Sequence, residues 1–248
     1  VFTFPDVMLT DARELVIYLA LGAMCALGGT LYVKTFFGIR NRFFRRLDLP
    51  TWLIPGIGGA LVGVLAIADL RVLGGGFGVI QSVIDGGIGI QAMLGLVVLK
   101  ILATSCTVGS GGSGGVFGPS LFIGAMLGGI VGAAGHALFP HIVQVPAAYV
   151  VVGMGSFLAG VANTPLAALI IVTEMTGSYH LLPALMLVSA FAFLFMRHVS
   201  IYEEQVQNKF HSPAHLKDFT VDVLRNLRLG EVFDRLENTA AAIVSNDV

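Results

Sequence analysis

Residues 109–119 have the sequence GSGGSGGVFGP, lie between two long apolar runs and contain no charged side chain. Glycines this frequent leave backbone N–H and C=O groups uncovered. In hydrocarbon each unpaired backbone group costs several kcal/mol, so irregular backbone is tolerated there only when it is buried in protein or lines a polar cavity. If the flanking runs lie in a membrane, this stretch is a candidate functional site.

The composition supports that condition. Of the 248 residues, 56% are hydrophobic and 12% are charged, whereas an ordinary soluble domain carries about 25% charged residues. The net charge of −1 gives no overall attraction to nucleic acid. Cys25 and Cys106 lie inside apolar runs, where a thiol behaves as a small hydrophobe, and we expect no disulfide. The chain begins without Met and shows no signal-peptide pattern, which is compatible with a fragment.

Seven apolar runs follow one another, and their lengths are uneven. Spanning a bilayer takes about 20 residues, and four runs reach that length: 13–37, 50–70, 88–108 and 116–139. Three shorter runs are bounded by Pro, Gly or Asn: 145–161, 164–176 and 181–196. Short, interrupted helices are typical of transporters, whose binding sites lie at helix ends near the midplane. We therefore predict an all-α, multi-pass membrane protein with short and broken helices.

The few charged residues indicate topology. The basic cluster RNRFFRR at 40–46 predicts a cytoplasmic loop, because Lys and Arg concentrate on that side of a membrane. From Ser200 onward charged residues become frequent, so we expect a soluble segment on the same side. Residues 224–233 look like the opening of a small folded module, but too few residues follow to build a core.

Two nucleotide motifs are excluded for the glycine-rich stretch. Residues 109–114 match G-x-G-x-x-G, a pattern that indicates a dinucleotide site only after a strand and with an acidic residue about 20 positions later. The preceding run is too long for a strand, and no acidic residue occurs between Asp85 and Glu174. No Lys follows the glycines, so a phosphate-binding P-loop is excluded as well.

An intramembrane serine protease is an alternative function. GGSG at 111–114 has the spacing of the nucleophile motif of such enzymes, with Ser113 as nucleophile and His136 or His180 as the base. His136 lies near the far end of the following helix, too distant if that helix is straight. His180 stays open as a partner for Ser113.

The backbone itself offers a third interpretation. A glycine-rich entry followed by VFGP and an apolar helix gathers free N–H groups and the positive end of the helix dipole at one point, and Pro119 suits the first turn. Such partial charges hold a small anion without the grip of a fixed Lys or Arg, which favours rapid release. The competing interpretation is that the glycines only permit close helix packing.

Several segments together resemble one family. GGVFGP at 114–119, followed by LFIGAMLG at 121–128, is similar to the G-x-F-x-P motif and downstream helix of the CLC chloride channel and chloride/proton exchanger family. Four further segments resemble family motifs in the same order and at the same spacing: GGGF at 74–77, GMG at 153–155, ANTPL at 162–166 and EMT at 174–176. The resemblance extends over about residues 10–209.

The resemblance implies a CLC-type multi-helix bundle, here the second of two inverted-topology repeats. It implies transport of chloride or similar small anions by a voltage-gated channel or a chloride/proton exchanger. Backbone groups of Gly115, Val116, Phe117 and Gly118 and the hydroxyl of Tyr202 would hold the anion. We expect no enzyme activity, no catalytic residue, no metal and no cofactor, with chloride as the transported ligand.

The resemblance also predicts what accompanies the chain. The family's first repeat, with a glutamate-bearing gating segment, has no match here, so that N-terminal repeat would have to be supplied from outside residues 1–248. We expect a transmembrane domain at 1–199, a last pore helix and cytoplasmic linker at 200–223, and the truncated start of a CBS-like cytoplasmic domain at 224–248. The expected partners are chloride, protons in an exchanger, lipid and a second copy in a homodimer, but no nucleic acid.

Two ionisable residues inside apolar runs are functional candidates by default. Glu174 falls in the EMT segment, where we expect a structural hydrogen-bonding group rather than part of the ion path. Lys100 could raise the local anion concentration or pair with a carboxylate from elsewhere, and its role stays open.

Overall fold

The computed structural model describes residues 2–3, 13–177, 179–203 and 205, and this part of the chain is helical with turns and contains no strand. The chain divides into two compact units, 1–202 and 203–248. Only Glu203 and Gln205 of the second unit are described, so the expected CBS-like segment lies outside the described residues. The expectation of an all-α protein is confirmed.

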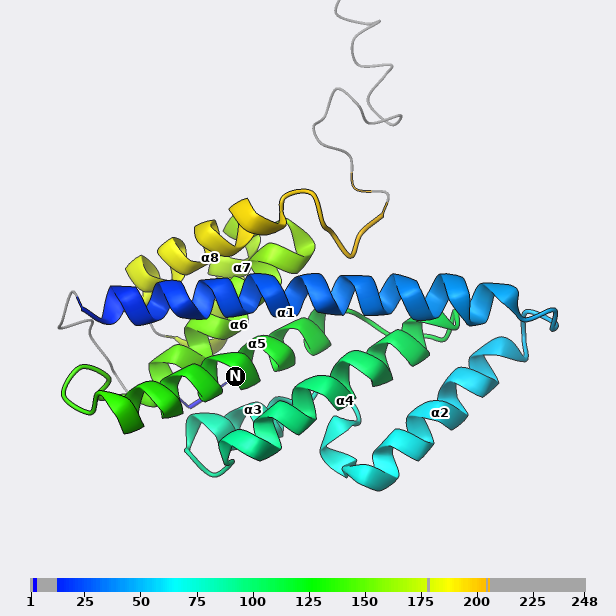
Figure 1. Cartoon of the computed structure of the whole chain (residues 1–248), viewed down its shortest axis with the longest axis horizontal. Helices are drawn as coiled ribbons and strands as arrows, with labels where there is room; N and C mark the ends of the chain where they lie inside the picture. The colour runs from blue at the N-terminus through cyan, green and yellow to red at the C-terminus, as the bar shows by residue number, and fades with distance from the viewer. Residues whose placement is uncertain (1, 4–12, 178, 204, 206–248) are drawn as a thin grey trace, which may run out of the picture. The chain divides into compact units, whose positions relative to one another are not determined.

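Eight α-helices and two 3₁₀ turns form the described part of the first unit (Figure 1). In chain order they are α1 Glu14–Arg42, η1 Phe44–Arg46, α2 Ile54–Ala68, η2 Leu70–Val72, α3 Phe77–Ile84, α4 Ile90–Gly109, α5 Phe117–Leu138, α6 Pro146–Ala162, α7 Pro165–Thr176 and α8 Leu182–Met196. Proline occupies one of the first two positions of α2, α6, α7 and α8. Its fixed φ suits that position and it has no N–H to leave unpaired.

Three of the described helical segments are long and apolar enough to cross a membrane: Glu14–Arg46, Ile90–Gly109 and Phe117–Leu138. The expected span at 50–70 is wrong in length, because α2 has 15 residues. At its start, residues 51–53 form a turn before Pro55. At its end, Asp69 is extended and caps the 3₁₀ turn η2. The Asp69 side chain accepts a hydrogen bond from the N–H of Arg71, the second residue of that turn. The helices α6, α7 and α8 match the three predicted short runs, whereas α3 has no counterpart among the predicted runs.

The basic segment at 40–46 also differs from the expected loop. Arg40 and Arg42 lie in the last turn of α1, and Phe44–Arg46 forms the 3₁₀ turn η1. Positive side chains at a helix C-terminus stabilise it by interacting with the helix dipole. The cluster is therefore continuous with the first membrane helix.

The centre of the unit is the antiparallel pair α5 and α6. A side chain at Gly124 would collide with the carbonyl oxygen of Gly153, and one at Gly128 would collide with that of Tyr149. One at Gly132 would lie 2.6 Å from the carbonyl oxygen of Pro146. Small residues at these spacings let two membrane helices approach backbone to backbone.

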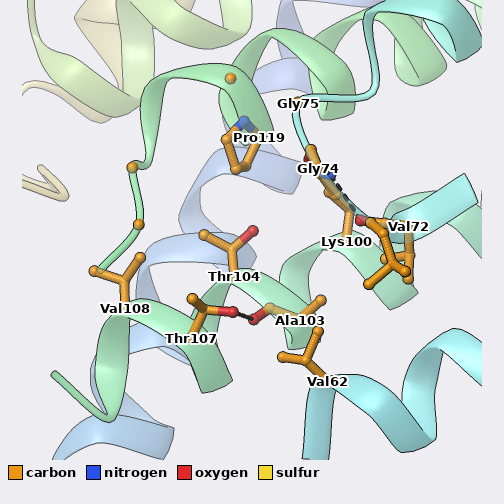
Figure 2. A pocket seen from close by; sticks show the side chains of 14 residues that line it. Val62, Val72, Gly74, Gly75, Lys100, Ala103, Thr104, Thr107, Val108 and Pro119 are labelled. Atoms are coloured by element: carbon orange, nitrogen blue, oxygen red, sulfur yellow. Dashed lines mark hydrogen bonds between the residues drawn. The ribbon is translucent and has the colours of Figure 1, made fainter. Parts of the chain in front are cut away.

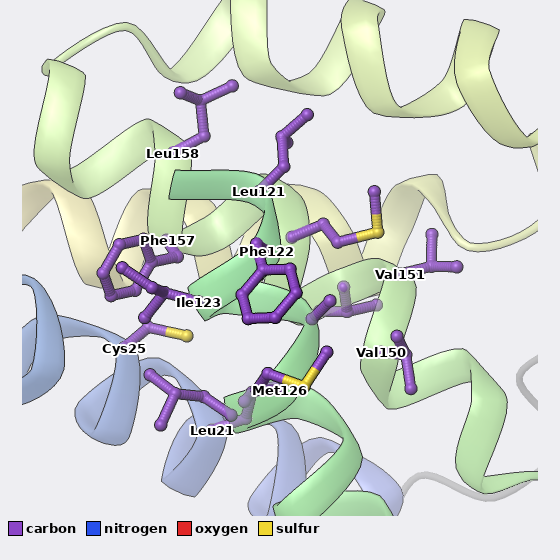
Figure 3. Packing of buried hydrophobic residues seen from close by; sticks show 14 of the residues in the cluster. Leu21, Cys25, Leu121, Phe122, Ile123, Met126, Val150, Val151, Phe157 and Leu158 are labelled. Atoms are coloured by element: carbon purple, nitrogen blue, oxygen red, sulfur yellow. The ribbon is translucent and has the colours of Figure 1, made fainter. Parts of the chain in front are cut away.

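Apolar side chains of this pair pack together with those of α1 (Figure 3). Phe122 and Met126 of α5, Phe157 of α6 and Leu21 and Cys25 of α1 are all fully buried. Cys106, like Cys25, is a free, buried thiol, so the absence of a disulfide between them is confirmed.

The helix α8 runs parallel to α1. Gly22 of α1 lies against Phe191, and Gly29 lies against Met196 at the end of α8. The last described turns follow directly, and the N–H of Ile201 donates to the carbonyl of Val161 at 3.0 Å. The chain therefore leaves α8 beside the middle of α1 and stays attached to the end of α6.

We predict that Gly128→Ala destabilises the protein by about 1–3 kcal/mol, because the added methyl group overlaps the Tyr149 backbone, which cannot yield as a flexible side chain would. The matched control is Gly95→Ala in α4, where a side chain meets no atom within 4 Å. Thermal unfolding of the detergent-purified full-length protein measures both variants. Equal melting temperatures for the two variants would contradict this role of the α5–α6 contact.

Candidate anion site

Residues 110–116 of the glycine-rich stretch are irregular, as predicted, and join α4, which ends at Gly109, to α5, which begins at Phe117. The N–H groups of Ser110, Gly111 and Gly112 bond back to the last turn of α4, on the carbonyls of Cys106, Val108 and Thr107. Gly111 has φ +82, a left-handed conformation that favours glycine. A side chain at Gly58 of α2 would collide with Ser110, so the turn is also packed against that helix.

The first turn of α5 leaves backbone donors without a partner in the helix. Val116 is the N-cap residue and makes no side-chain cap bond. The first helical bond runs from the N–H of Ser120 to the carbonyl of Val116 at 3.0 Å. The N–H groups of Phe117 and Gly118 therefore have no acceptor within α5, and Pro119 has no N–H. This arrangement is the one that attracts anions to helix N-termini.

A pocket of roughly 350 Å³ lies beside this helix terminus. Besides Val62 of α2 and Val72 and Leu73 at the end of η2, three segments distant in the sequence line it (Figure 2). They are the entry to α5 at Gly114, Gly115, Gly118 and Pro119, the turn before α3 at Gly74 and Gly75, and the α4 face with Lys100, Ala103, Thr104 and Thr107. The entry to α5 therefore faces a concave surface formed with α4, α2 and the turn before α3.

Lys100 is part of the pocket wall. Its Nζ donates to the carbonyl oxygens of Val72 at 2.8 Å and Gly74 at 2.7 Å. The same nitrogen lies 4.8 Å from the ring centroid of Phe122, and the residue is 2% exposed. The carbonyls and the ring are neutral, so they hold the ammonium without cancelling its charge. Lys100 therefore makes the pocket electropositive.

Two threonines follow Lys100 on the same face of α4. Thr107 Oγ1 donates to the carbonyl of Ala103 at 2.9 Å. The Thr104 side chain points into the pocket in Figure 2 and is nearly buried. Hydroxyls can donate to an anion as well as to a backbone carbonyl, so this face adds polar groups to the site.

The predicted anion-binding residues are only partly brought together. Gly115 and Gly118 line the pocket, whereas Val116 packs its side chain against the core and Phe117 is 38% exposed. Tyr202 does not line the pocket. It is 46% exposed, and its N–H donates to Ser200 Oγ at 3.1 Å. An anion site shared by Tyr202 and α5 stays a prediction.

The proposed protease dyad of Ser113 and His136 is not formed. Ser113 is exposed and precedes α5, whereas His136 lies in the last turn of that unbroken helix, about 28 Å further along at a rise of about 1.5 Å per residue. His136 Nδ1 is 2.7 Å from the carbonyl oxygen of Val143. His136 therefore cannot act as a base for Ser113.

Glu174 accepts a hydrogen bond from the hydroxyl of Tyr179 at 2.8 Å. This bond ties the end of α7 to the turn before α8. It fits the structural role expected for Glu174.

Most of the pocket wall was not predicted from the sequence. Gly74 and Gly75 were not connected with the α5 terminus, although a glycine run before a short helix is visible in the sequence. The positions 100, 104 and 107 share one face of a helix, since residues three and four apart are neighbours. That spacing of one Lys and two Thr inside an apolar run was the available signal.

We predict that Lys100→Met lowers the stability of the full-length protein by about 2 kcal/mol, because it leaves the Val72 and Gly74 carbonyls without a donor. Lys100→Arg keeps the charge and restores part of that stability. Lys34→Met, on the exposed side of α1, is the control. Thermal unfolding in detergent compares the three variants. A Lys100→Met protein as stable as Lys34→Met would contradict the stabilising role of the Lys100 hydrogen bonds.

Comparisons with known proteins identify the family. The family model described as voltage gated chloride channel matches residues 1–197. A ClcB-like protein of Ralstonia nicotianae is 37% identical over 187 residues, which are 75% of this chain and 43% of that protein. The H⁺/Cl⁻ exchange transporter ClcA of Vibrio cholerae is 32% identical over 199 residues, 79% of this chain and 42% of that protein.

The fold agrees as well. The crystal structure of a slow cyanobacterial Cl⁻/H⁺ antiporter superposes with a TM-score of 0.73 at 23% identity, over 79% of this chain and 46% of that one. The chain spans less than half the length of these relatives. With its apolar helices and its match over residues 1–197, the protein is an integral membrane protein and belongs to the voltage gated chloride channel (CLC) family.

Proposed function

We propose that this chain forms part of a pathway for chloride or a similar small anion across a membrane. One observation carries the proposal. The α5 N-terminus presents the Phe117 and Gly118 N–H groups, without acceptors in the helix, beside an electropositive pocket. The relatives, which include a chloride channel protein and an H⁺/Cl⁻ exchange transporter, support the same ligand.

The geometry provides a mechanism for holding an anion briefly. An anion that leaves water loses its hydration shell, and the helix dipole and free N–H groups replace part of it. The charge of Lys100 attracts the anion, but the bonds to Val72 and Gly74 hold the ammonium at the wall. A permeating ion therefore gains electrostatic stabilisation without a tight ion pair, which allows release.

The contacting groups in this proposal are the backbone amides around Gly115, Val116, Phe117 and Gly118. The hydroxyl of Tyr202 completes the set as an additional donor. The Tyr202 segment is anchored to the C-terminal end of α6, because the N–H of Ile201 donates to the carbonyl of Val161. This anchoring supports Tyr202 as a neighbour of the pathway.

The remaining parts of the transporter are proposed to lie outside the chain. The relatives are more than twice as long as the matched region, which leaves room for a first repeat with the gating glutamate. We further propose a homodimer and a cytoplasmic C-terminal tail. The choice between channel and proton-coupled exchanger depends on the residues of that first repeat.

The direct test uses the full-length protein that contains this chain, reconstituted in liposomes under a chloride gradient, with chloride efflux and external pH recorded together. We expect chloride efflux, because the helix terminus provides an anion site. Opposed, stoichiometric proton movement identifies an exchanger, and chloride movement alone identifies a channel. The absence of any chloride efflux in this experiment would overturn the proposed function.

The role of Tyr202 is tested by Tyr202→Phe in the same assay. Loss of a hydrogen bond to a charged ligand costs about 1.5–3 kcal/mol, so we expect a rise of roughly tenfold or more in the chloride concentration for half-maximal flux. Tyr179→Phe removes an exposed hydroxyl that bonds Glu174 and serves as the control. Unchanged affinity and selectivity in Tyr202→Phe would remove Tyr202 from the site.

The serine protease alternative makes a separate prediction. A protease dependent on Ser113 loses all activity in Ser113→Ala, whereas an anion site built from backbone amides retains its flux because the substitution keeps the backbone. The flux assay in liposomes, with an added peptide substrate, measures both activities in one preparation. Loss of flux in Ser113→Ala would contradict the amide-based site.

A further inference from the structure

Residues Phe2 and Thr3 are fixed to two helices that are far from them in sequence. The N–H of Phe2 donates to the carbonyl of Met175 in the last turn of α7 at 3.0 Å. That carbonyl is one of the last four of its helix, which have no partner within the helix. Phe2 itself is 8% exposed and belongs to the main apolar core.

The side chain of Gln81 in α3 binds the backbone of the next residue, Thr3. Gln81 Oε1 accepts the N–H of Thr3 at 3.0 Å, and Gln81 Nε2 donates to the carbonyl of Thr3 at 3.0 Å. The amide thus pairs with both backbone groups of one residue. Nε2 also donates to Asp85 Oδ1 at 2.9 Å, one turn further along α3, which orients the amide.

This pairing does not use the Thr3 side chain. A carboxamide carries one acceptor and two donors, and here both donors and the acceptor have partners. Any residue with an N–H can occupy position 3 without loss of these bonds, whereas position 81 needs the amide. The contact therefore depends on the Gln81 amide and on the Thr3 backbone, and not on the Thr3 side chain.

The strap, which we define as Phe2 and Thr3, is connected by contacts to the anion site. The ring of Phe2 lies 6.1 Å from that of Phe77, the first residue of α3. The Phe77 ring occupies the space where a side chain at Gly75 would lie, 2.8 Å from that position. The backbone of Gly75 in turn lies 3.8 Å from the position of a side-chain carbon at Gly118, in the first turn of α5.

We propose that the strap fixes α3 and the Gly74–Gly75 turn against the α5 N-terminus, with Gln81 as a positioning residue for the anion site. The inference rests on the proposed function for its effect on anions. Lys100 holds the same turn from the other side through the carbonyl of Gly74. The pocket wall at Gly75 is therefore held from α4 by Lys100 and from the strap through Phe77.

The test uses the full-length protein in a lipid bilayer and three variants. Gln81→Leu removes both bonds to Thr3. Thr3→Ala keeps them, since they involve only the backbone. Ser82→Ala is the control for α3 itself, because Ser82 Oγ bonds only to the Gly78 carbonyl of its own helix among the described contacts.

The first measurement is amide hydrogen exchange of the peptide that contains Phe2 and Thr3. We expect Gln81→Leu to speed exchange at Thr3 by about fivefold or more, the effect of one ordinary hydrogen bond. Thr3→Ala and Ser82→Ala should match the wild type. Unchanged exchange in Gln81→Leu overturns the strap. Gln81→Asn, whose amide is one carbon shorter, replaces Gln81→Leu if the latter does not fold.

The second measurement separates positioning from a loss of folded protein. A smaller active fraction lowers the flux of every anion equally, whereas a displaced pocket wall changes half-saturation and the ratio of chloride to nitrate flux. We expect Gln81→Leu to change both values by about twofold, and the two control variants to change neither. Faster exchange with both values unchanged overturns the positioning role.

A wild-type protein that moves no anion removes the proposed function and the positioning role together. The exchange measurement then still decides whether Gln81 holds the strap. The two failures are therefore distinguishable.

Discussion

Backbone polar groups in a membrane protein need partners, and this requirement governs the architecture around the pocket. The carbonyls of Val72 and Gly74 accept hydrogen bonds from the ammonium of Lys100, and the carbonyl of Met175 accepts one from the N–H of Phe2. The turn at 110–112 bonds back to α4. Against this background of satisfied groups, the free donors at the start of α5 are an exception that a ligand can use.

The close packing of α5 against α6 stabilises the fold and so allows these N–H groups to stay unpaired. The α5–α6 contact at Gly124, Gly128 and Gly132 brings two backbones together without side chains between them. Residues 120–129 of α5, which follow directly on its first turn, are buried. Phe122, one turn into the helix, packs between the core and the Lys100 ammonium. A single helix therefore connects the apolar core with the polar pocket.

Much of this fold could be predicted from the sequence, because hydrophobic run length and Pro or Gly boundaries are local signals. The starts and ends of α6, α7 and α8 followed from them, as did the irregular entry to α5. The length of α2 did not, since the capping bond of Asp69 to Arg71 ends an otherwise apolar stretch. The partners of Lys100 and Gln81 could not be predicted either, because both contacts join segments more than 25 residues apart and depend on tertiary packing.

The glycine contacts between α5 and α6 also limit how the protein can move. Each glycine faces a particular carbonyl, so sliding one helix along the other by a turn would bring larger side chains against the backbone. The two helices therefore behave as one rigid body, and a displacement of α6 carries the free N–H groups of α5 with it. The chain changes direction on either side of this pair, at Gly111 with its left-handed backbone and at Asn163, where α6 ends with φ 53. The free N–H groups of α5 therefore keep a fixed spacing from the backbone of α6.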